Sequence, residues 1–506
     1  MAVKKYIADR DTTITDAYRS NLRCRGTGSN MGAADILEVF SIYGQAASGS
    51  VERCRTLVKF PIETMVTDRD NGDLPESGSV RYILKMYNAP HGQTLPRNFT
   101  LVLAPVSTSW EEGEGLDMDN YTDITHNKTG SNWVLAGSGT SWSTDGGDYH
   151  AANRFEHKFV DGTEDVDIDI TSLVEQWITG SEIAAGSGSS PNGGANGFKN
   201  YGLGVFLTAS QETGSTKVSY YTKKFFARSS EFFLKRPSIE ARWDSSIKDN
   251  RSSFYYSSSL VAGADNLNTL YLYNYVRGQL KDIPKLTGSN NIYVDLYSGS
   301  TGPTGPRLSM SPGGGVPDEG QSATGSRRST GIYSASISIT AAATPLTTLF
   351  DVWRVGTTKY HTGSITPLTF SASPQNPGSG LYTTSLTNRR PVYNAKEKAA
   401  RFRVFTRQKN WNPTIYTKAT TTVKNETIED AYFKLFRVVD EHVIIAYGTG
   451  STKHSLMSYD KDGNYFDIDM TMLEPGFSYG LKLMYYINGA YQEQPEIFKF
   501  RVEENG

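Results

Sequence analysis

The sequence predicts an all-β protein made of successive β-sandwich domains. Short runs rich in β-branched and aromatic residues recur along the chain, and Pro, Gly or Asn residues bound them. Gly, Ser, Thr and Tyr are abundant, which suits many short strands joined by tight turns. A chain of 506 residues is too long for one hydrophobic core, so about three domains are expected.

Two runs near the amino terminus, residues 82–87 and 99–103, have this strand composition. Residues 165–170 alternate between acidic and apolar side chains, so a strand there turns its valine and isoleucines to one face. A helix of one or two turns is expected next, with Thr171 as its cap and Gly180 at its end. Its apolar face consists of Leu173, Val174, Trp177 and Ile178.

A series of short phrases follows a fixed order through the first half of the chain. They are GSNMG (28–32), LEV (37–39), RTLVKF (55–60), SWEEG (109–113), WSTDGGD (142–148), DITSLVEQWITG (169–180), NYGL (200–203), SE (230–231) and KRPSI (235–239). In order and spacing they resemble the DNRLRE family, a group of jelly-roll modules related to carbohydrate-binding modules. The resemblance covers residues 6–244. It implies an N-terminal jelly-roll β-sandwich over residues 1–244, with a binding or structural role and no catalysis.

Five residues of this half are candidates for a carbohydrate site: Trp110, Trp133, Trp142, Asp145 and Asp148. Sugar rings stack on aromatic planes, and carboxylates bind sugar hydroxyls. The alternative, which we favour, is that the tryptophans pack under the loops and hold the jelly roll closed.

A run of oxygen-bearing side chains is suited to a structural calcium ion: Asp117, Asp119, Asn120 and Asp123. The run has neither the glycine at the sixth position nor the glutamate at the twelfth that an EF-hand loop requires. A non-binding acidic turn is therefore the favoured alternative, and no other cofactor is expected.

The second half is predicted to contain two immunoglobulin-like sandwiches. A polar connector, residues 245–266, leads to strand-like runs at 267–278, 291–297, 331–339 and 348–353, which define a sandwich over 267–372. Its Gly- and Pro-rich insertion, residues 298–330, is expected to be a long exposed loop. The last sandwich is expected over residues 373–506.

The run Leu270 to Val276 is tyrosine-rich and uncharged, as protein interfaces favour. If one face of this strand packs its own sandwich, Tyr271, Tyr273 and Tyr275 share the other face. They are then available to other proteins, or they seal the junction between the first two domains of the chain. The sequence leaves both alternatives open.

Catalytic motifs are not evident. None of the seven histidines lies in a metalloprotease motif, and no Gly-x-Ser-x-Gly elbow is present. Glu111 and Glu112 form the only acidic pair beside an aromatic residue in a phrase, and a solvated loop explains them. Both C-terminal sandwiches contain the Lys, Asn and Asp residues that an intramolecular isopeptide bond requires, but the sequence does not show which of them meet.

Two cysteines, Cys24 and Cys54, are each flanked by arginines and can be cross-strand neighbours. A disulfide is conceivable there, but synthesis in a cytoplasm favours two reduced, part-buried thiols.

The basic pairs at 223–224 and 389–390 are expected to lie on solvated faces.

Residues 1–9 contain no apolar segment of the kind found in a signal peptide, and no run approaches about eighteen apolar residues. We therefore expect no secretion and no membrane span. A formal net charge of −2 gives no basic field for nucleic acid. The architecture is typical of extracellular modules, although the chain is expected to be made and kept in a cytoplasm. A virus particle combines the two, because it is assembled in a cytoplasm and later works outside the cell.

The tandem of a DNRLRE-like module and immunoglobulin-like modules resembles virion structural proteins of tailed, especially contractile-tailed marine, bacteriophages. That resemblance implies a non-enzymatic component of the tail, neck or baseplate, or a head-attached decoration. Its expected partners are neighbouring virion proteins and copies of itself. The alternative is an adhesin that binds host-surface polysaccharide through the jelly roll.

Overall fold

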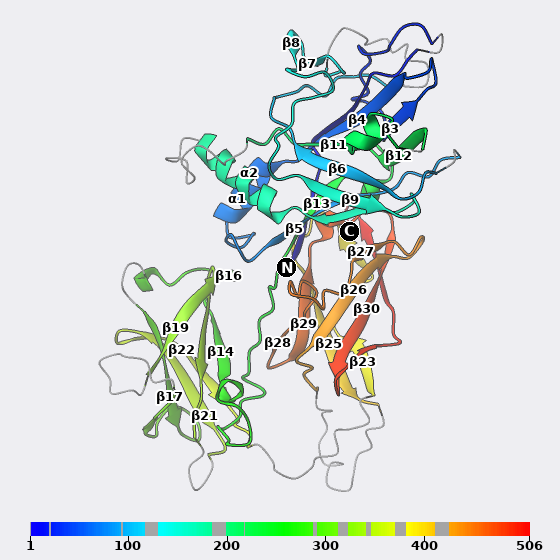
Figure 1. Cartoon of the computed structure of the whole chain (residues 1–506). Coiled ribbons are helices and arrows are strands. Elements are labelled where there is room, and N and C mark those ends of the chain that lie inside the picture. The colour runs from blue at the N-terminus through cyan, green and yellow to red at the C-terminus, as the bar shows by residue number, and fades with distance from the viewer. Residues whose placement is uncertain are drawn as a thin grey trace. The chain divides into compact units, whose positions relative to one another are not determined.

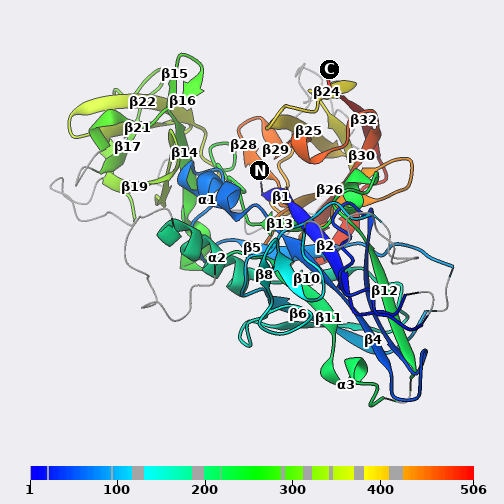
Figure 2. The same ribbon diagram turned by 90° about the horizontal axis from the view of Figure 1, so that it is seen from above.

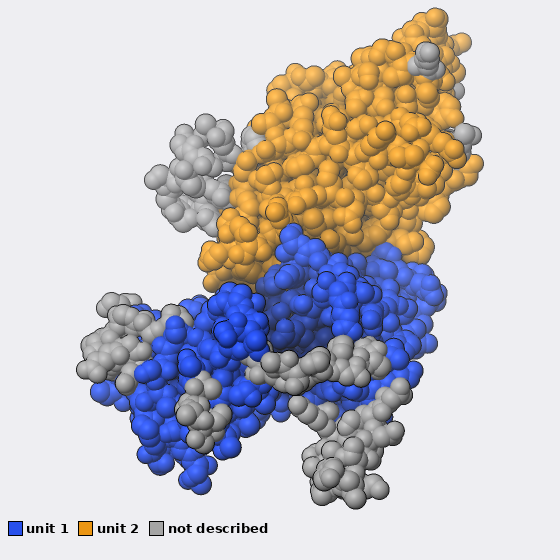
Figure 3. All heavy atoms as spheres, turned by 60° about the horizontal axis from the view of Figure 1, so that its bottom comes forward, with its two compact units in different colours: residues 1, 244–471, 475–506 blue, residues 2–243, 472–474 orange. Residues whose placement is uncertain are grey.

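The computed structural model divides into two compact units, which are described separately (Figure 3). One unit holds Ala2–Trp243 and Met472–Glu474, and the other holds Met1, Asp244–Thr471 and Pro475–Gly506. The structure describes residues 2–19, 22–92, 95–116, 130–184, 199–216, 218–286, 291–311, 322–340, 346–369, 381–409 and 425–505. The fold is all-β, as the sequence predicts, with an N-terminal jelly roll followed by two immunoglobulin-like sandwiches.

Two antiparallel sheets form the jelly roll (Figure 1). The four-stranded sheet has the order β1 (Val3–Ile7), β13 (Ser238–Arg242), β5 (Arg81–Met86), β10 (Val166–Asp169). The seven-stranded sheet has the order β12 (Tyr220–Phe226), β3 (Ile36–Tyr43), β4 (Val51–Lys59), β11 (Leu203–Leu207), β6 (Phe99–Pro105), β9 (Phe155–Phe159), and β2 (Arg10–Thr15) also pairs with β4. A small hairpin, β7 (Leu135–Gly137) with β8 (Thr140–Ser141), and the short α3 (Ala209–Glu212) complete it.

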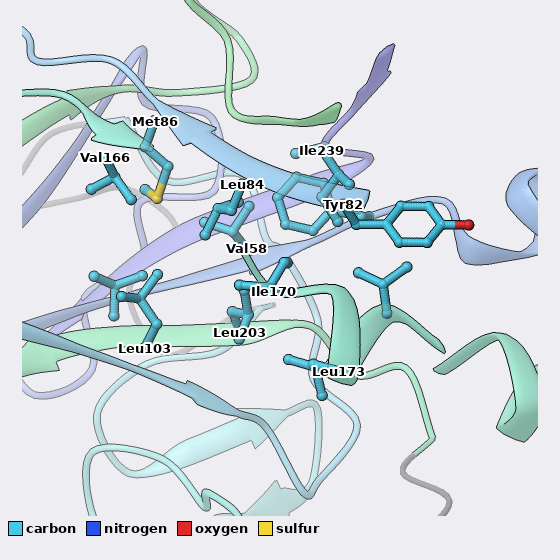
Figure 4. Packing of buried hydrophobic residues seen from close by; sticks show 14 of the residues in the cluster. Val58, Tyr82, Leu84, Met86, Leu103, Val166, Ile170, Leu173, Leu203 and Ile239 are labelled. Carbon is cyan, nitrogen blue, oxygen red and sulfur yellow. The ribbon is translucent and has the colours of Figure 1, made fainter. Parts of the chain in front are cut away.

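Period-two alternation builds the core between these sheets. On β5, Tyr82, Leu84 and Met86 are buried while the residues between them are half-buried. Figure 4 shows these side chains with Leu103 and Leu203 in the same apolar cluster, to which β6 and β11 contribute from the other sheet. The main core of the jelly roll therefore lies between its two sheets.

Helices α1 (Ile62–Asp70) and α2 (Thr171–Ala184) lie side by side, joined by an Arg69–Glu175 ion pair of 2.8 Å (Figures 1 and 2). The predicted apolar face of α2 is confirmed, since its four residues are at most 1% exposed. The expected end at Gly180 is wrong, because the helix continues to Ala184. The expected cap is also wrong: Asp169 Oδ1 accepts the Thr171 N–H at 2.9 Å. The sequence did not predict α1.

In the second sandwich, the strands form one continuous series of hydrogen-bonded neighbours, and this series folds into two sheets. Its order is β14 (Asn268–Tyr273), β20 (Ile332–Ile337), β19 (Ser322–Ser329), β17 (Ile292–Ser298), β21 (Leu349–Val355), β22 (Thr358–Ile365), with β18 (Arg307–Leu308) on β17. The first half of β19 pairs with β17 and its second half with β20, so this strand passes between the sheets. The predicted loop at 298–330 is therefore wrong in part, because β18 and β19 lie within it.

The third sandwich has the strand order of an immunoglobulin domain. One sheet is β23 (Tyr382–Leu386), β25 (Ala400–Gln408), β29 (Gly463–Ile468), β28 (Ser458–Asp460). The other is β24 (Val392–Asn394), β32 (Phe498–Glu503), β30 (Ser478–Ile487), β26 (Ala431–Arg437), β27 (Val443–Ile445), with β31 (Ala490–Glu493) on β30. Phe433 and Phe466 stack between the sheets with ring centroids 4.3 Å apart.

The predicted connector has an ordered path. Ile247 donates its N–H to Ser458 Oγ at 3.0 Å, and Tyr255 pairs in parallel with Leu368. The predicted boundary near residue 373 lies outside the described residues. Within the described part of the chain, no helix is both long and apolar enough to cross a membrane.

The contact boundary between Trp243 and Asp244 leads to a prediction about folding. Because the apolar cluster between the jelly-roll sheets ends at Trp243, a chain terminated at Asp244 is expected to fold alone. Circular dichroism should show a β-rich spectrum with a cooperative unfolding transition. A chain terminated inside β13, at Ile239, serves as the control and should not fold. Insoluble or unfolded protein from several end points near Asp244 would contradict the prediction.

Candidate functional site

The three candidate tryptophans lie in the segment that joins β6 to β9, and all three are buried. Trp110, Trp133 and Trp142 are 4%, 2% and 5% exposed. They form a second apolar cluster with Ile14, Leu57, Val106 and Ala136, apart from the core between the sheets. With no indole face open to solvent, the predicted stacking site for sugars is not formed. Their burial agrees with the favoured alternative, in which the tryptophans pack under the loops.

Hydrogen bonds fix two of these indoles. Trp110 Nε1 donates to the Tyr201 carbonyl at 2.7 Å, and Trp142 Nε1 donates to the Asn132 carbonyl at 2.8 Å. A buried indole N–H needs such a partner. The NYGL phrase therefore holds the SWEEG phrase, through Tyr201 and Trp110.

The two candidate acids differ in their surroundings. The Asp148 carboxylate accepts the N–H groups of Ser143 and Thr144, each at 2.9 Å, and the Thr108 hydroxyl at 3.1 Å. These bonds close the turn of the WSTDGGD phrase. Asp145 is exposed. Of the five predicted residues, only Asp145 is thus free of an internal structural role in the described contacts.

Asn30, in the GSNMG phrase, is the centre of this closure. Its Nδ2 donates to the carbonyls of Glu112 and Ser131, at 2.8 and 2.7 Å. Its Oδ1 accepts the N–H groups of Gly32 and Gly115, at 3.1 and 3.0 Å. The side chain is 1% exposed, so these bonds are shielded from water. We call Asn30 and these four bonded residues the Asn30 latch.

Gly113 shows why this corner requires glycine. It has a φ of +82°, and a Cβ on it would overlap the Asn30 amide. The glycine of the SWEEG phrase thus lets the backbone approach Asn30.

The acidic pair of the SWEEG phrase is not a solvated loop, which corrects the prediction for Glu112. Glu112 Oε1 accepts the Asp11 N–H at 2.9 Å, and its carboxylate pairs with Arg228 at 2.9 Å. Glu111 is exposed, and its bonds to the Ser138 N–H and hydroxyl lower its pKa. Both carboxylates therefore fasten backbone segments together.

Asp11 lies next to Glu112 and is 1% exposed. Burial, together with the Glu112 charge, raises the pKa of Asp11 to about 7. The folded chain thus holds this proton more tightly than the unfolded chain does. The stability from it is fully present below an unfolded pKa near 3.8 and is lost as the pH rises through about 7.

This linkage predicts a pH-dependent stability. Between about pH 5 and 8, the free energy of unfolding of the wild type should fall relative to that of Asp11→Asn, which cannot ionise. Urea unfolding across that range measures the difference. Asp145→Asn, a change at an exposed acid, should follow the wild type. Parallel pH profiles for Asp11→Asn and the wild type would show that Asp11 stays charged.

Arg55 joins the tryptophan cluster to α3. Its guanidinium pairs with Glu212 at 2.6 Å and donates from Nη1 to the Gly146 carbonyl at 2.9 Å. It also lies 5.3 Å from the Trp133 ring centroid and 5.0 Å from that of Phe206. The side chains of Arg55 and Glu212 are only 13% and 9% exposed. No sequence pattern indicates this pair, because Arg55 and Glu212 are far apart along the chain.

Lys223 corrects another expectation, that residues 223–224 form a solvated basic face. Lys223 is 0% exposed and shares its strand face with Tyr221 and Phe225. Its Nζ donates to Asn88 Oδ1 at 2.8 Å and to the carbonyls of Gly162 and Glu164 at 2.9 and 2.7 Å. Lys224 points to the opposite face and pairs with Glu38 at 3.4 Å, as expected of a surface lysine.

A small hollow of about 290 Å³ opens on the jelly roll near this Lys224–Glu38 pair. It combines apolar and charged lining residues, which are Thr13, Met31, Ala34, Asp35, Ile36, Glu38, Ala89, Pro90, His91, Leu116 and Lys224. Burial and the nearby lysines lower the pKa of His91. Such a hollow can hold a small polar ligand.

Of the three predicted tyrosines, Tyr271 and Tyr273 share one face of β14, with ring centroids 6.4 Å apart, and Tyr275 lies on another strand. Tyr271 is 7% exposed, and Tyr273 is half-buried beside Tyr465 of the third sandwich, where burial raises the pKa of Tyr273. Only Tyr275 is exposed, at 59%, on the hairpin of β15 (Tyr275–Val276) and β16 (Gln279–Leu280). Tyr273 therefore lies at a junction between the second and third sandwiches, whereas the junction considered from the sequence was between the first two domains.

The predicted calcium ligands Asp117, Asp119, Asn120 and Asp123 lie outside the described residues. Among the residues that are described, no group of three His, Cys, Asp or Glu side chains is placed to hold a metal. The two cysteines are not joined by a disulfide: Cys24 is exposed rather than part-buried, and Cys54 is fully buried, with Sγ 3.1 Å from the Glu38 carbonyl.

No family model and no curated protein matches the chain. Among solved structures, it is similar to the N-terminal Ig1-2 module of the Drosophila receptor protein tyrosine phosphatase DLAR, at 8% identity over 47% of this chain and 91% of that one, with a TM-score of 0.14. A marsupial T cell receptor is similar at 11% identity over 47% of this chain and 69% of that one, also with a TM-score of 0.14. The strand order of the sheets, described above, is the basis for calling these sandwiches immunoglobulin-like.

Proposed function

We propose that this protein is a non-enzymatic structural component of a tailed-bacteriophage virion, in the tail, neck or baseplate or as a head-attached decoration. The observation that carries the proposal is that residues of the short sequence phrases make their contacts inside the jelly roll. Trp110, Asn30, Arg55 and Asp148 bind other parts of the jelly roll, which favours a rigid building block over an open ligand site.

Exposed aromatic residues on hairpins are the surfaces through which such a block would bind neighbouring virion proteins or its own copies. Tyr275 and Val276 are 59% and 43% exposed on the β15–β16 hairpin. Tyr486 and Tyr491, on β30 and β31, are 42% and 49% exposed, with ring centroids 4.8 Å apart. Tyrosine provides a large contact area with a polar tip, which suits an interface.

Particle incorporation tests this proposal. The wild type should be found in purified particles at a fixed copy number, and Tyr275→Ser with Val276→Ser should lower that number several-fold. The matched control is Tyr220→Ser, which changes another exposed tyrosine, at 37%, on the jelly roll. Mass-spectrometric quantification of particles gives the copy number. Absence of the wild-type protein from particles would overturn the proposal.

The second candidate function, an adhesin for host polysaccharide, is supported by the small hollow beside the Lys224–Glu38 pair. A glycan array probed with the full chain tests it, with Asp35→Asn as the variant. Binding that Asp35→Asn abolishes would favour the adhesin. Neither function involves turnover, so products released from any polysaccharide would contradict both.

A further inference from the structure

Lys223 and Asn88 meet where the segment that follows β5 runs beside β12. Lys223 is on β12 of the seven-stranded sheet, and Asn88 follows β5 of the four-stranded sheet. An isolated antiparallel bridge between Asn88 and Phe225 holds the two backbones side by side. The Lys223 Nζ is 2.8 Å from Asn88 Oδ1, so the amide carbon is one covalent bond further away.

From this geometry we propose that Lys223 and Asn88 become joined by an intramolecular isopeptide bond. The two reacting groups are already held together, so the reaction pays no further cost for bringing them into contact. The bond would tie β12 of the seven-stranded sheet covalently to the segment that follows β5 of the four-stranded sheet. This inference does not depend on the proposed function.

Aromatic rings shield the Lys223 amine from water. Its Nζ lies 4.6 Å from the Phe159 ring centroid and 5.3 Å from that of Phe225. Burial lowers the pKa of Lys223 to about 8, although the charges of Glu164 and Asp165 act in the opposite direction. A desolvated lysine with a lowered pKa has a larger fraction of neutral amine, which is the form that attacks a carbonyl carbon.

The reaction needs no oxidant or co-reactant. The Lys223 ammonium first loses a proton, and the neutral Nζ attacks Cγ of Asn88. A C–N bond forms, the Cγ–Nδ2 bond breaks, and Nδ2 leaves as ammonia after it takes one hydrogen from Nζ. One amine and one primary amide thus become one secondary amide and one ammonia.

We assign to Asp165 the transfer of the proton from Nζ to the leaving nitrogen. Its Oδ1 accepts the backbone N–H of Asn88 at 2.7 Å, and its charge acts on Lys223. Glu164 is less suited to this role, because its carboxylate accepts the N–H groups of Val160, Asp161 and Gly162, each at 2.7 Å. Asp165 is exposed, so ammonia can leave on its side of the strand.

Intact-mass spectrometry of the denatured full-length chain tests the bond. The wild type should be lighter than its sequence mass by one ammonia, and a digest should yield a branched peptide that joins the segments holding Asn88 and Lys223. Lys223→Arg keeps the positive charge but should restore the full sequence mass. The matched control, Lys224→Arg, changes the neighbouring lysine and should retain the loss.

Two further variants keep the test informative even if Lys223→Arg fails to fold. Asn88→Asp should lose one water instead of one ammonia, because hydroxide then takes the place of the amine as leaving group. Asp165→Asn should slow bond formation several-fold in a time course after synthesis, and an unchanged rate would overturn the role of Asp165. A wild type at full sequence mass, or a branched peptide that does not contain Lys223, would overturn the proposal.

Discussion

Replacing Asn30 by Ala should destabilise the jelly roll by roughly 4 kcal/mol, one of the two largest effects expected in this chain. The substitution removes the donor to the carbonyls of Glu112 and Ser131 and the acceptor for the N–H groups of Gly32 and Gly115. Because Asn30 is 1% exposed, water cannot replace these bonds without opening the structure. Each buried group left without a partner costs about 1–3 kcal/mol.

Urea unfolding of the full-length chain, followed by tryptophan fluorescence, measures this loss. Trp110, Trp133 and Trp142 lie in the cluster that the Asn30 latch closes, so their emission should report the change. Asn30→Asp should be equally harmful, since it turns a carboxylate oxygen toward the carbonyls that now accept from Nδ2. Asn71→Ala, at an exposed residue, is the control and should change stability by less than about 0.5 kcal/mol. Equal stabilities for Asn30→Ala and Asn71→Ala would disprove the role of the latch.

Local pattern was enough to predict several strands and the buried face of each of them. Tyr82 and Leu84 on β5, and Leu270 and Leu272 on β14, are buried where strict alternation puts them. The same alternation puts Lys223 in the core face of β12, but its charge, next to Lys224, led to the opposite expectation. The sequence of one strand does not show that the Lys223 ammonium will donate hydrogen bonds to Asn88 and to two backbone carbonyls.

The missed elements have weak local signals. The sequence of β19, SATGSRRS, contains one small apolar residue and lies in a Gly- and Pro-rich stretch, so its pairing with two neighbours determines its structure. Helix α1 is short and buries only Ile62, Met65 and Asp68.

The sequence located the candidate site, but it predicted the wrong role for part of its residues. The phrases with Asn30 and Trp110 do meet in the fold. Their partners, however, are mostly backbone carbonyls and N–H groups at distant positions, which a sequence pattern does not encode. A tryptophan that stacks on a sugar and a tryptophan that packs under a loop look the same in a sequence, so only burial distinguishes them.

Replacing Arg55 by Met should cost about 3–5 kcal/mol, because it leaves the Glu212 carboxylate buried without its partner. The loss also removes the bond to the Gly146 carbonyl and the packing over Trp133 and Phe206. Urea midpoints of the full-length chain give the change in the free energy of unfolding. The control is Arg81→Met at an exposed ion pair, where Arg81 and Asp169 are 56% and 46% exposed and 3.6 Å apart. Exposed pairs contribute at most about 1 kcal/mol.

A double-mutant cycle separates the buried charge from the packing around Arg55. Glu212→Gln removes the charge that Arg55→Met leaves without a partner, so the double variant should be more stable than Arg55→Met alone. A favourable coupling energy of about 2 kcal/mol is expected between the two residues, near the upper end for contacting side chains. If the double variant is instead no more stable than Arg55→Met, the cost lies in the lost stacking on Trp133 and Phe206, and the ion pair contributes little. If Arg55→Met costs no more than Arg81→Met, the pair is solvated in solution and α3 does not depend on it.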